Sequence, residues 1–255
     1  MTPKISIITA TYNSAATVQH TLQSIATQTY SNIEHIVVDG LSSDNTVAIA
    51  KQFATVKIIC EKDNGLYDAI NKGIKASTGA IVGILNSDDF FPNNTIVQSI
   101  ANAFNQHNVD AVYGDIAFVK PNNIQKIVRL YSSNNFKPSK FKYGYMPAHP
   151  SFYVKKECFD KYGYYQIDYK IAADYELLMR MMYTHNISTT YINQVLVHMR
   201  TGGVSNQNLA SRYVLNQEII KACKANKVST NMALLSLKYF TKIGEFIKPM
   251  LGIKQ

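Results

Sequence analysis

The first 107 residues alternate between short apolar runs and stretches with helical periodicity, and this alternation constrains the fold more than any other feature. Runs rich in β-branched residues are each followed by a segment whose apolar residues recur three or four positions apart. The expected strands cover residues 4–12, 33–40, 56–61 and 80–86, and the expected helices cover 14–28, 43–54, 67–77 and 93–107. Repeats of this kind, with continuously apolar strands, predict an α/β fold with a parallel sheet covered by helices on both faces.

The second half of the chain follows a different pattern. The stretches "DAVYGDIAFV" and "IQKIVRLY" flank Pro121-Asn122-Asn123 and predict a β-hairpin. A loop rich in Tyr and Lys is expected to extend to about residue 147. It is followed by an expected helix over 171–185, a strand over 188–200 and a helix over 208–226.

Composition limits the functional classes without choosing one. The net charge of +9 suggests an anionic partner, which would be nucleic acid, anionic lipid or a phosphorylated substrate. Cys60, Cys158 and Cys223 are far apart and odd in number, so they predict neither a disulfide framework nor a zinc site. A reducing compartment is therefore expected. The N-terminus enters a strand almost at once and no apolar stretch is long enough to span a bilayer, so we expect a cytoplasmic protein.

Three of the expected strands end in distinctive residues: Thr9 to Asn13, then Asp39-Gly40, then Asn86-Ser87-Asp88-Asp89. In an open parallel sheet all three ends meet at the edge where ligands bind. The adjacent carboxylates Asp88 and Asp89 repel each other, so they form either a hydrated turn or a site for Mg²⁺ or Mn²⁺ that in turn holds a diphosphate. Asp39 either caps the next helix or, if Asp44 is the cap, is free for a ligand.

Other nucleotide-binding classes have weaker support. The chain contains no GxGxxG after its first strand and no GxxxxGK[ST], which disfavours nicotinamide dehydrogenases and P-loop ATPases. A sugar-phosphate nucleotidyltransferase would usually have a glycine-rich, basic loop where this chain has "TATYNSAAT". A non-catalytic basic protein that binds nucleotides or nucleic acid is a further alternative. Its basic residues should form one dense stripe, whereas here they are dispersed, so we expect no nucleic-acid partner.

The segments "SIITATYN", "IVVDGLSSDNT", "DNGLYDAINKGIKASTGAIVGILNSDD" and "AADYELLMR", in this order, resemble the family 2 glycosyltransferases with the GT-A fold. The resemblance covers residues from about 4 to 205 and is closest to the single-addition enzymes of bacterial surface-polysaccharide assembly. It implies a Rossmann-like, mostly parallel sheet flanked by helices. It divides the chain into a GT-A domain over 1–228, with a nucleotide-binding half (1–107) and an acceptor-binding half (108–228), and a C-terminal helical extension over 229–255.

The resemblance also implies an activity. The enzyme would use Mn²⁺ or Mg²⁺ to transfer a sugar from a nucleotide-sugar donor, most commonly a UDP-hexose or UDP-N-acetylhexosamine. The acceptor would be a hydroxyl of a glycan or of a polyprenyl-diphosphate-linked intermediate. A metal stabilises the leaving diphosphate and a base takes the acceptor's proton. A single base opposite the leaving nucleotide implies inversion at the anomeric carbon.

Residue roles follow from the resemblance position by position. Asp174 matches the catalytic base, and Asp89, with Asp88, matches the metal-binding acids. The residues expected to contact the nucleotide are Thr9, Ala10, Thr11, Tyr12, Asp39, Asp68 and Asp88. The chain departs from the family pattern at Asn86, Ile70 and Ala173. Because Ile70 replaces a common arginine, Lys72 or a residue elsewhere must supply positive charge to the phosphates.

Three further polar residues have two interpretations each. His149 contacts the donor sugar or the acceptor, or it is an ordinary loop histidine. His198 completes the metal shell and Arg200 meets a phosphate, or both simply end a strand. The Gly202-Gly203 pair that follows could hinge a loop that closes over the donor.

The tail over 229–255 is basic and amphipathic. Tyr239, Ile243, Phe246, Ile247 and Met250 share one helical side, and Lys238, Lys242 and Lys248 lie elsewhere around it. Such a helix either packs on its own domain or on a second subunit of a homodimer, or lies in the headgroup region of an anionic membrane. The second interpretation predicts peripheral association with the inner face of the cytoplasmic membrane.

Overall fold

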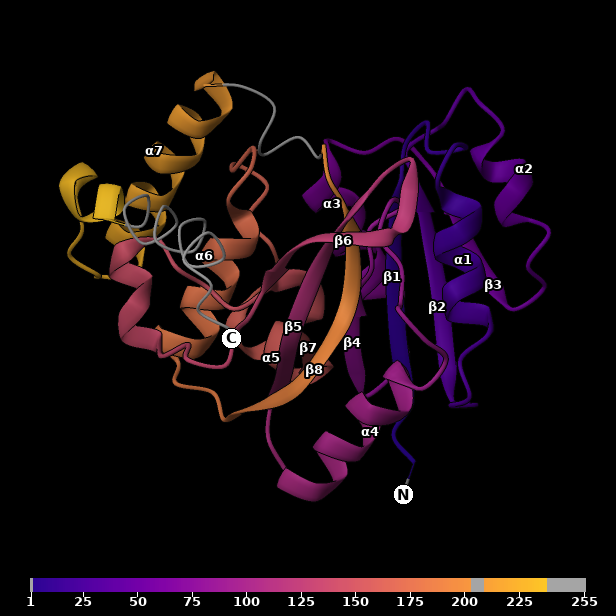
Figure 1. The fold of residues 1–255 in the computed structure, drawn as a ribbon, viewed down its shortest axis with the longest axis horizontal. Helices are drawn as coiled ribbons and strands as arrows, with labels where there is room; N and C mark the ends of the chain where they lie inside the picture. The colour runs from indigo at the N-terminus through magenta and orange to yellow at the C-terminus, as the bar shows by residue number, and fades with distance from the viewer. Residues whose placement is uncertain (1, 203–208, 238–255) are drawn as a thin grey trace.

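A computed structural model describes residues 2–202 and 209–237 and has one eight-stranded sheet with helices against it (Figure 1). The strands are β1 (Ile5–Thr11), β2 (Ile33–Asp39), β3 (Val56–Cys60), β4 (Ile81–Ile84), β5 (Ala111–Lys120), β6 (Asn123–Tyr131), β7 (Tyr153–Lys155) and β8 (Thr189–Arg200). The α-helices are α1 (Val18–Ala26), α2 (Thr46–Ala50), α3 (Leu66–Ala76), α4 (Ile96–His107), α5 (Lys156–Tyr162), α6 (Ala173–Met179) and α7 (Leu209–Ala225). The 3₁₀ segments η1 (Pro138–Tyr143) and η2 (His149–Ser151) precede β7, and a π-helical turn, η3 (Arg180–Thr184), extends α6.

The sheet order is β3-β2-β1-β4-β7-β5-β6, with β8 paired to β5. Strands β1 to β4 are parallel to their neighbours within this group, and β8 is parallel to β5. Strand β7 runs antiparallel to both β4 and β5, and β5 and β6 form the expected antiparallel hairpin. The mostly parallel α/β architecture expected from the sequence is therefore confirmed.

The direction of β7 determines where the site lies. Because β7 is antiparallel to β4 and β5, its first residue, Tyr153, pairs with Gly83 near the end of β4 and with Val112 near the start of β5. Strand β8 is parallel to β5 and ends at the same edge as β5. In Figure 1 this carboxyl edge is the upper one. The loops after β1, β2, β4 and β8 and the segment before β7 therefore share one edge.

Helices on both faces bury the strands. Strand β1 is buried along its whole length. On one face Ile8 and Val38 pack in the same core cluster as Ile70 and Ile74 of α3. On the other face Ile5 and Ile7 share a cluster with α1 and α4, to which α4 contributes Ile96, Val97, Ile100 and Phe104.

The structure differs from the sequence-based expectations in several elements. Strand β7, helix α5 and the 3₁₀ segments η1 and η2 were not expected, and α2 is shorter than predicted. A helix over 232–237 begins the C-terminal extension, but the residues from Lys238 to Met250 that carry the tail hypothesis lie outside the described residues, as does Gly203. Among the described residues, no helix combines the length and apolar character needed to cross a membrane.

Strand β7 packs closely on β4. Gly83 pairs with Tyr153, and a Cβ on Gly83 would lie 2.0 Å from the Tyr153 ring. The Tyr153 side chain is fully buried, and its hydroxyl has no hydrogen-bond partner among the described residues. The ring therefore occupies the space that any larger residue at position 83 would need.

Gly83→Ala is expected to destabilise the fold by about 3 kcal/mol, because the buried ring must move to admit the methyl group. Tyr153→Phe is the matched control. It removes only an unpaired buried hydroxyl, so stability should be unchanged or slightly higher. Urea unfolding of the three proteins measures both effects. A Gly83→Ala variant as stable as the wild type would contradict the packing described.

His35 makes stability depend on pH. Its ring is buried on β2, 3.1 Å from the Thr9 hydroxyl, and burial lowers its pKa from 6.5 to about 3. As pH falls below 6.5, His35 becomes protonated in the unfolded chain but stays neutral in the folded chain. The free energy of unfolding therefore decreases over the range from about pH 6.5 to 3.

Between about pH 7.5 and pH 5, His35 should account for a loss of about 2 kcal/mol in unfolding free energy. The measurement is the difference in urea midpoint between the two pH values. His35→Gln should show a smaller difference, whatever its absolute stability. His107→Gln, at an exposed helix end, should behave like the wild type. Equal pH dependence in all three proteins would contradict a neutral buried His35.

Candidate functional site

The loops after β1 and β2 are tied together at the carboxyl edge. Thr11 donates to Asp39 Oδ2 at 2.7 Å, and the Ser42 amide and hydroxyl donate to the same carboxylate at 2.8 and 2.6 Å. Asp39 is buried and has these polar contacts, so it anchors the loop. Asp44 accepts from the Thr46 amide at 2.9 Å near the start of α2, which is the capping role considered for it.

Thr9, Ala10 and Tyr12 are placed differently from one another. The side chains of Thr9 and Ala10 are buried in the sheet, and Thr9 contacts His35. Tyr12 is 67% exposed. Two other large apolar side chains, Leu41 and Leu66, are exposed after β2 and β3. Three adjacent strand ends therefore each present an exposed apolar side chain at this edge.

Backbone strain accompanies these loops. Leu41 has φ of +66°, a left-handed conformation that is unfavourable for a residue with a bulky side chain. Asn13 also has a positive φ, and its side-chain oxygen accepts from the Ser43 amide at 2.9 Å. Ser14 reaches across to Ser87, with 3.0 Å between the hydroxyls, and links the first loop to the loop after β4.

Lys72 and Asp68 lie on α3, after β3. Lys72 Nζ is 3.6 Å from Asp68 and 3.3 Å from Glu61, and donates to the Lys62 carbonyl. Asp68 accepts from the Asn64 amide at 2.9 Å. The positive charge of Lys72 is therefore shared between two acids in this structure.

Asp89 is the most unusual carboxylate of the chain. It is 1% exposed, and its Oδ1 is buried with no hydrogen-bond partner in the part of the chain that the structure describes, while Oδ2 accepts from Asn86 at 3.2 Å. Burial, and then the charge of the neighbouring Asp88, raise the pKa of Asp89 well above its usual range. Thr21 fixes the loop by donating to the carbonyls of Asp89 and Ser87 at 2.7 and 3.0 Å. The loop thus holds a buried carboxyl group in a position that favours a cation.

The end of β8 packs on this loop. Phe90 and His198 form a two-way backbone bridge, with bonds of 3.1 and 2.8 Å, and their rings make an edge contact. Arg200 donates to the Asp88 carbonyl and to His20 Nδ1, and its guanidinium lies over the Phe90 ring. Burial lowers the pKa of Arg200, and the nearby charges of Asp88 and Asp89 oppose that shift. Burial also lowers the pKa of His198, which favours a neutral ring.

The residues present fit a divalent cation held partly by its substrate. The described residues contain no cluster of three or more His, Cys, Asp or Glu side chains with metal-site geometry. Mg²⁺ sites that act on phosphates commonly use one or two carboxylates and take the remaining oxygens from substrate and water. Asp89, with its unpartnered oxygen, and Asp88 provide that donor set. His198 as a metal ligand stays a prediction.

Asp174 and His149 meet, although they are 25 positions apart in the sequence. His149 Nε2 lies 3.2 Å from Asp174 Oδ2, and Asp174 Oδ1 accepts from the Tyr175 amide at 2.7 Å. The side chain of His149 is 33% exposed and that of Asp174 is 13% exposed. His149 begins η2, which packs against β4, β5, β8 and α6. The pair therefore lies at the same sheet edge as Asp88 and Asp89.

Glu218 of α7 caps the segment that leads into α6. Its carboxylate accepts from the amides of Lys170, Ile171 and Ala172 at 2.7 to 2.9 Å. The amides just ahead of the helix are therefore satisfied from another helix, and Asp174 is not their cap. The sequence did not predict the roles of Glu218 and His20. Glu218 caps residues 170–172 and His20 contacts Arg200, and both partners are distant in the chain, so no local pattern indicates either contact.

Two other acids of this region, Glu176 and Asp168, have structural partners. Glu176 forms an ion pair with Arg180 at 2.9 Å and accepts from Asn226. Asp168 forms an ion pair with Lys221 at 2.7 Å and is exposed. Neither shares the His149 contact.

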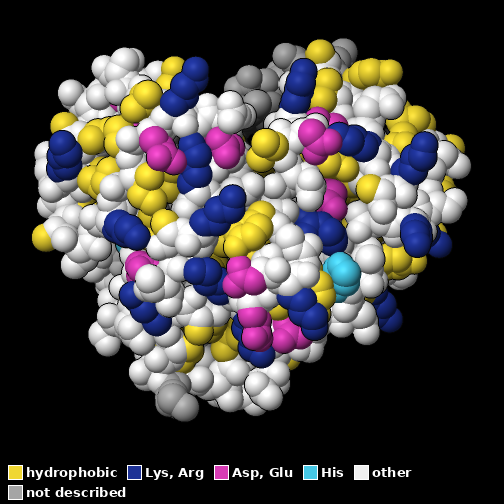
Figure 2. Space-filling model, turned by 180° about the vertical axis from the view of Figure 1, so that it is seen from behind, with side chains coloured by type: hydrophobic (Ala, Val, Ile, Leu, Met, Phe, Trp, Pro, Cys, Tyr) yellow, Lys and Arg dark blue, Asp and Glu magenta, His cyan; other side chains and the backbone are white. Residues whose placement is uncertain are grey.

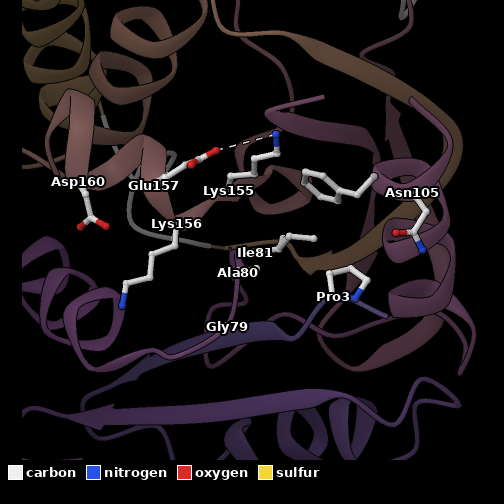
Figure 3. A pocket seen from close by; sticks show the side chains of 10 residues that line it. Pro3, Gly79, Ala80, Ile81, Asn105, Lys155, Lys156, Glu157 and Asp160 are labelled. Carbon is white, nitrogen blue, oxygen red and sulfur yellow. Dashed lines mark ion pairs between the residues drawn. The ribbon is translucent and has the colours of Figure 1, made fainter. Parts of the chain in front are cut away.

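A shallow pocket lies at the opposite edge, where β4 begins and β7 ends (Figure 3). It includes Gly79, Lys155 and Lys156, and Glu157 pairs with Lys155 there at 3.9 Å. The residues that suggest chemistry are at the carboxyl edge instead.

On the rear face of the molecule, Lys and Arg side chains are scattered among acidic ones and form no continuous basic stripe (Figure 2).

Comparison with known sequences identifies relatives over most of the chain. The sequence model described as "Glycosyl transferase family 2" matches residues 6–162. A "PGL/p-HBAD biosynthesis glycosyltransferase" of Mycobacterium bovis is 29% identical over 211 residues, covering 80% of this chain and 80% of that relative. An uncharacterized glycosyltransferase of Mycobacterium tuberculosis is 30% identical over 187 residues, covering 70% of this chain and 68% of that protein.

Solved structures share the fold. S. aureus TarS 1–349 in complex with UDP-GlcNAc superposes with a TM-score of 0.69 at 19% identity, covering 91% of this chain and 70% of that chain. The mannosyltransferase PcManGT from Pyrobaculum calidifontis, in complex with GDP-Man and Mn²⁺, gives a TM-score of 0.63 at 18% identity, covering 98% and 82%. These likenesses confirm the GT-A type of fold expected from the sequence motifs.

Replacing Asp89 should raise the thermal stability of the protein and at the same time remove its stabilisation by metal. Ionised Asp89 is buried without full compensation, and its raised pKa means that stability falls as pH rises above the unfolded value of 3.8. Asp89→Asn should therefore melt at a higher temperature than the wild type at neutral pH. Mn²⁺ with a nucleoside diphosphate should raise the melting temperature of the wild type and not that of Asp89→Asn. Equal stabilisation of both proteins would contradict the metal assignment.

Proposed function

The chain belongs to glycosyl transferase family 2, and from this we propose that it transfers a sugar from a nucleotide-sugar donor to a hydroxyl of a glycan or lipid-linked acceptor, with inversion and with the help of Mn²⁺ or Mg²⁺. The observation that carries the proposal is the juxtaposition at one sheet edge of a buried, unpartnered Asp89 oxygen and the Asp174–His149 pair. The Asp89 oxygen suits a metal-bound diphosphate, and the Asp174–His149 pair suits removal of a proton from the acceptor.

Residues 1–107 are proposed to bind the nucleotide. Tyr12, Leu41 and Leu66 offer exposed apolar surface for a base, and the hydrogen bonds of Asp39 fix the loops that carry Tyr12 and Leu41. The structures of relatives bound to UDP-GlcNAc and to GDP-Man support a nucleotide-sugar as the class of donor. Within that class, a UDP-hexose or UDP-N-acetylhexosamine is the donor we propose.

Asp89 and Asp88 would hold the divalent cation, which when bound neutralises charge that develops on the leaving diphosphate. Arg200 lies beside both acids and is proposed to balance their charge and to meet a phosphate oxygen. His198 supports the loop through its backbone bridge to Phe90. Lys72 is a weaker partner for phosphate, because Asp68 and Glu61 share its charge.

Residues 108–228 are proposed to bind and activate the acceptor. Asp174 is the carboxylate on which removal of the acceptor's proton depends, and its place beside His149 supports that role. A single base, proposed to act from the side opposite the diphosphate, implies direct displacement at the anomeric carbon. A single displacement inverts the configuration at the anomeric carbon.

Release of nucleoside diphosphate from a panel of UDP-, GDP- and dTDP-sugars, with Mn²⁺ and with a chelator, tests the function. The proposal expects metal-dependent release with one preferred donor, increased by a glycan or polyprenyl-diphosphate acceptor. A sugar-phosphate nucleotidyltransferase would instead form the nucleotide-sugar from a nucleoside triphosphate. Release that is unaffected by the chelator would contradict the metal dependence.

Asp174→Asn should lower the transfer rate by about 10²–10⁴-fold while donor binding stays intact, because an amide cannot provide the charge that the base requires. Asparagine can still accept from the Tyr175 amide, and Glu218 still caps the preceding segment, so unfolding should be nearly unchanged. Single-turnover transfer and donor titration measure the two effects. Near-normal transfer by a folded Asp174→Asn variant would exclude this assignment.

A further inference from the structure

Strand β6 exposes three aliphatic side chains within four positions. Ile127, Val128 and Leu130 are 53%, 44% and 47% exposed. The strand ends the sheet order and pairs with β5 alone among the described residues. Single exposed apolar residues are common on protein surfaces, whereas neighbouring ones that together form a patch mark a surface that contacts something else.

The chain around this strand contains no acidic residue. From Ile116 to Lys156 there is no Asp or Glu, and there are eight basic residues: Lys120, Lys126, Arg129, Lys137, Lys140, Lys142, Lys155 and Lys156. The whole chain has a net charge of +9, so this segment accounts for almost all of it. Among the described residues, no acid forms an ion pair with Lys120, Lys126 or Arg129. The β5–β6 hairpin therefore presents positive charge next to aliphatic surface.

The hairpin lies beside the candidate site. Val119 of β5 pairs with Ile127 on one side and with Arg200, at the end of β8, on the other. The Thr201 amide also donates to the Val119 carbonyl at 3.0 Å. Arg200 in turn donates to the Asp88 carbonyl. The exposed aliphatic group is thus linked to the loop of Asp88 through one residue of β5 and one of β8.

We propose that the β5–β6 hairpin docks on an anionic lipid bilayer. Ile127, Val128 and Leu130 would enter the boundary between headgroups and acyl chains, and the basic side chains would lie against the lipid phosphates. Aliphatic side chains gain free energy by leaving water, and anionic headgroups attract Lys and Arg. The docking goes beyond the proposed function. Its consequence, that the site opens toward a lipid-linked acceptor in the membrane, rests on that function.

A second copy of the chain fits this surface less well. In a two-fold symmetric dimer the same surface meets itself, so the basic segment would face its own positive charges. The pairing of β6 with β5 also passes from Arg129 to Ile127 and skips Val128, which is a bulge. Bulges and basic side chains on an edge strand both hinder its pairing with another strand.

Nucleic acid would also meet the positive charge, but it does not explain the apolar part of the surface. Unpaired bases bind protein by stacking on aromatic side chains. The three exposed apolar side chains of β6 are aliphatic and have no ring to stack on. Hydrocarbon is therefore the better match for them.

Co-sedimentation of the full-length chain with lipid vesicles tests the docking. The anionic vesicles contain phosphatidylglycerol and phosphatidylcholine in equal parts, and pure phosphatidylcholine vesicles are the uncharged comparison. The wild type should bind the anionic vesicles at low salt, with binding that weakens as salt screens the charges. The double variant Ile127→Ser/Leu130→Ser should partition about tenfold less, and so should Lys126→Glu.

Two control variants match these changes. Ile167→Ser removes an isoleucine that is 55% exposed elsewhere, and Lys51→Glu, at the end of α2, alters the net charge by the same amount as Lys126→Glu. Both should bind the anionic vesicles like the wild type. All the substituted side chains are exposed, so the urea midpoints should stay close to that of the wild type. Every variant keeps the tail over 229–255 unchanged.

A wild-type protein that ignores the anionic vesicles at low salt would overturn the proposal. Hairpin variants that bind as well as the wild type would overturn it too, because the contact would then lie elsewhere, as in the tail. A dimer that is lost in the double variant, in place of vesicle binding, would identify a second copy as the occupant. The measurement needs neither donor nor metal, so its failure would leave the proposed function untouched, and failure of the donor panel would leave the docking untouched.

Discussion

The contact between Gly83 and the Tyr153 ring holds the two parts of the sheet together. Strand β7 has only three residues, yet it is the strand between β4 and β5, and all of β5, β6 and β8 lie on its far side. Pairing at this joint is close because Gly83 has no side chain, so the buried ring of Tyr153 can occupy the space where a Cβ would be. This joint therefore helps to fix the histidine that precedes β7 relative to the acids that follow β4, while the Phe90–His198 bridge holds those acids against the end of β8.

The site stores unfavourable interactions that a bound ligand would relieve. Asp89 is buried with one oxygen unpaired, next to a second carboxylate, and Arg200 loses hydration at the same place. Leu41 is held in a left-handed backbone conformation in the neighbouring loop. Each of these features costs stability in the free protein. Their concentration at one sheet edge is what a preorganised site for a cation and a diphosphate requires, because the charges need not be rearranged when the donor arrives.

Local sequence signals were sufficient for one part of the fold and insufficient for another. Hydrophobic periodicity predicted β1 to β4 with their helices, because each of these elements buries a face that its own residues define. The pair Asp88-Asp89 was visible because it follows a buried strand. Strand β7 was missed because three residues carry no periodicity. The Asp174–His149 contact and the Glu218 cap depend on pairing between distant segments, which one sequence does not reveal.

The supports of the two proposed halves differ, and α3 joins them: Tyr67 donates to the Ile171 carbonyl just ahead of α6, and Asn71 exchanges hydrogen bonds with Tyr165. The loops proposed to bind the nucleotide are fixed by hydrogen bonds among Thr11, Asp39 and Ser42 and between Ser14 and Ser87, all within residues 1–107. The start of α6 is fixed from α7, through Glu218. Helix α7 lies beyond residue 162, where the family match ends. Changes in α7 can therefore alter the orientation of Asp174 without touching the nucleotide loops. The proposed donor and acceptor halves are therefore coupled through the β4–β7 joint, the Phe90–His198 bridge and the contacts of α3, while the Glu218 cap acts on the acceptor half alone.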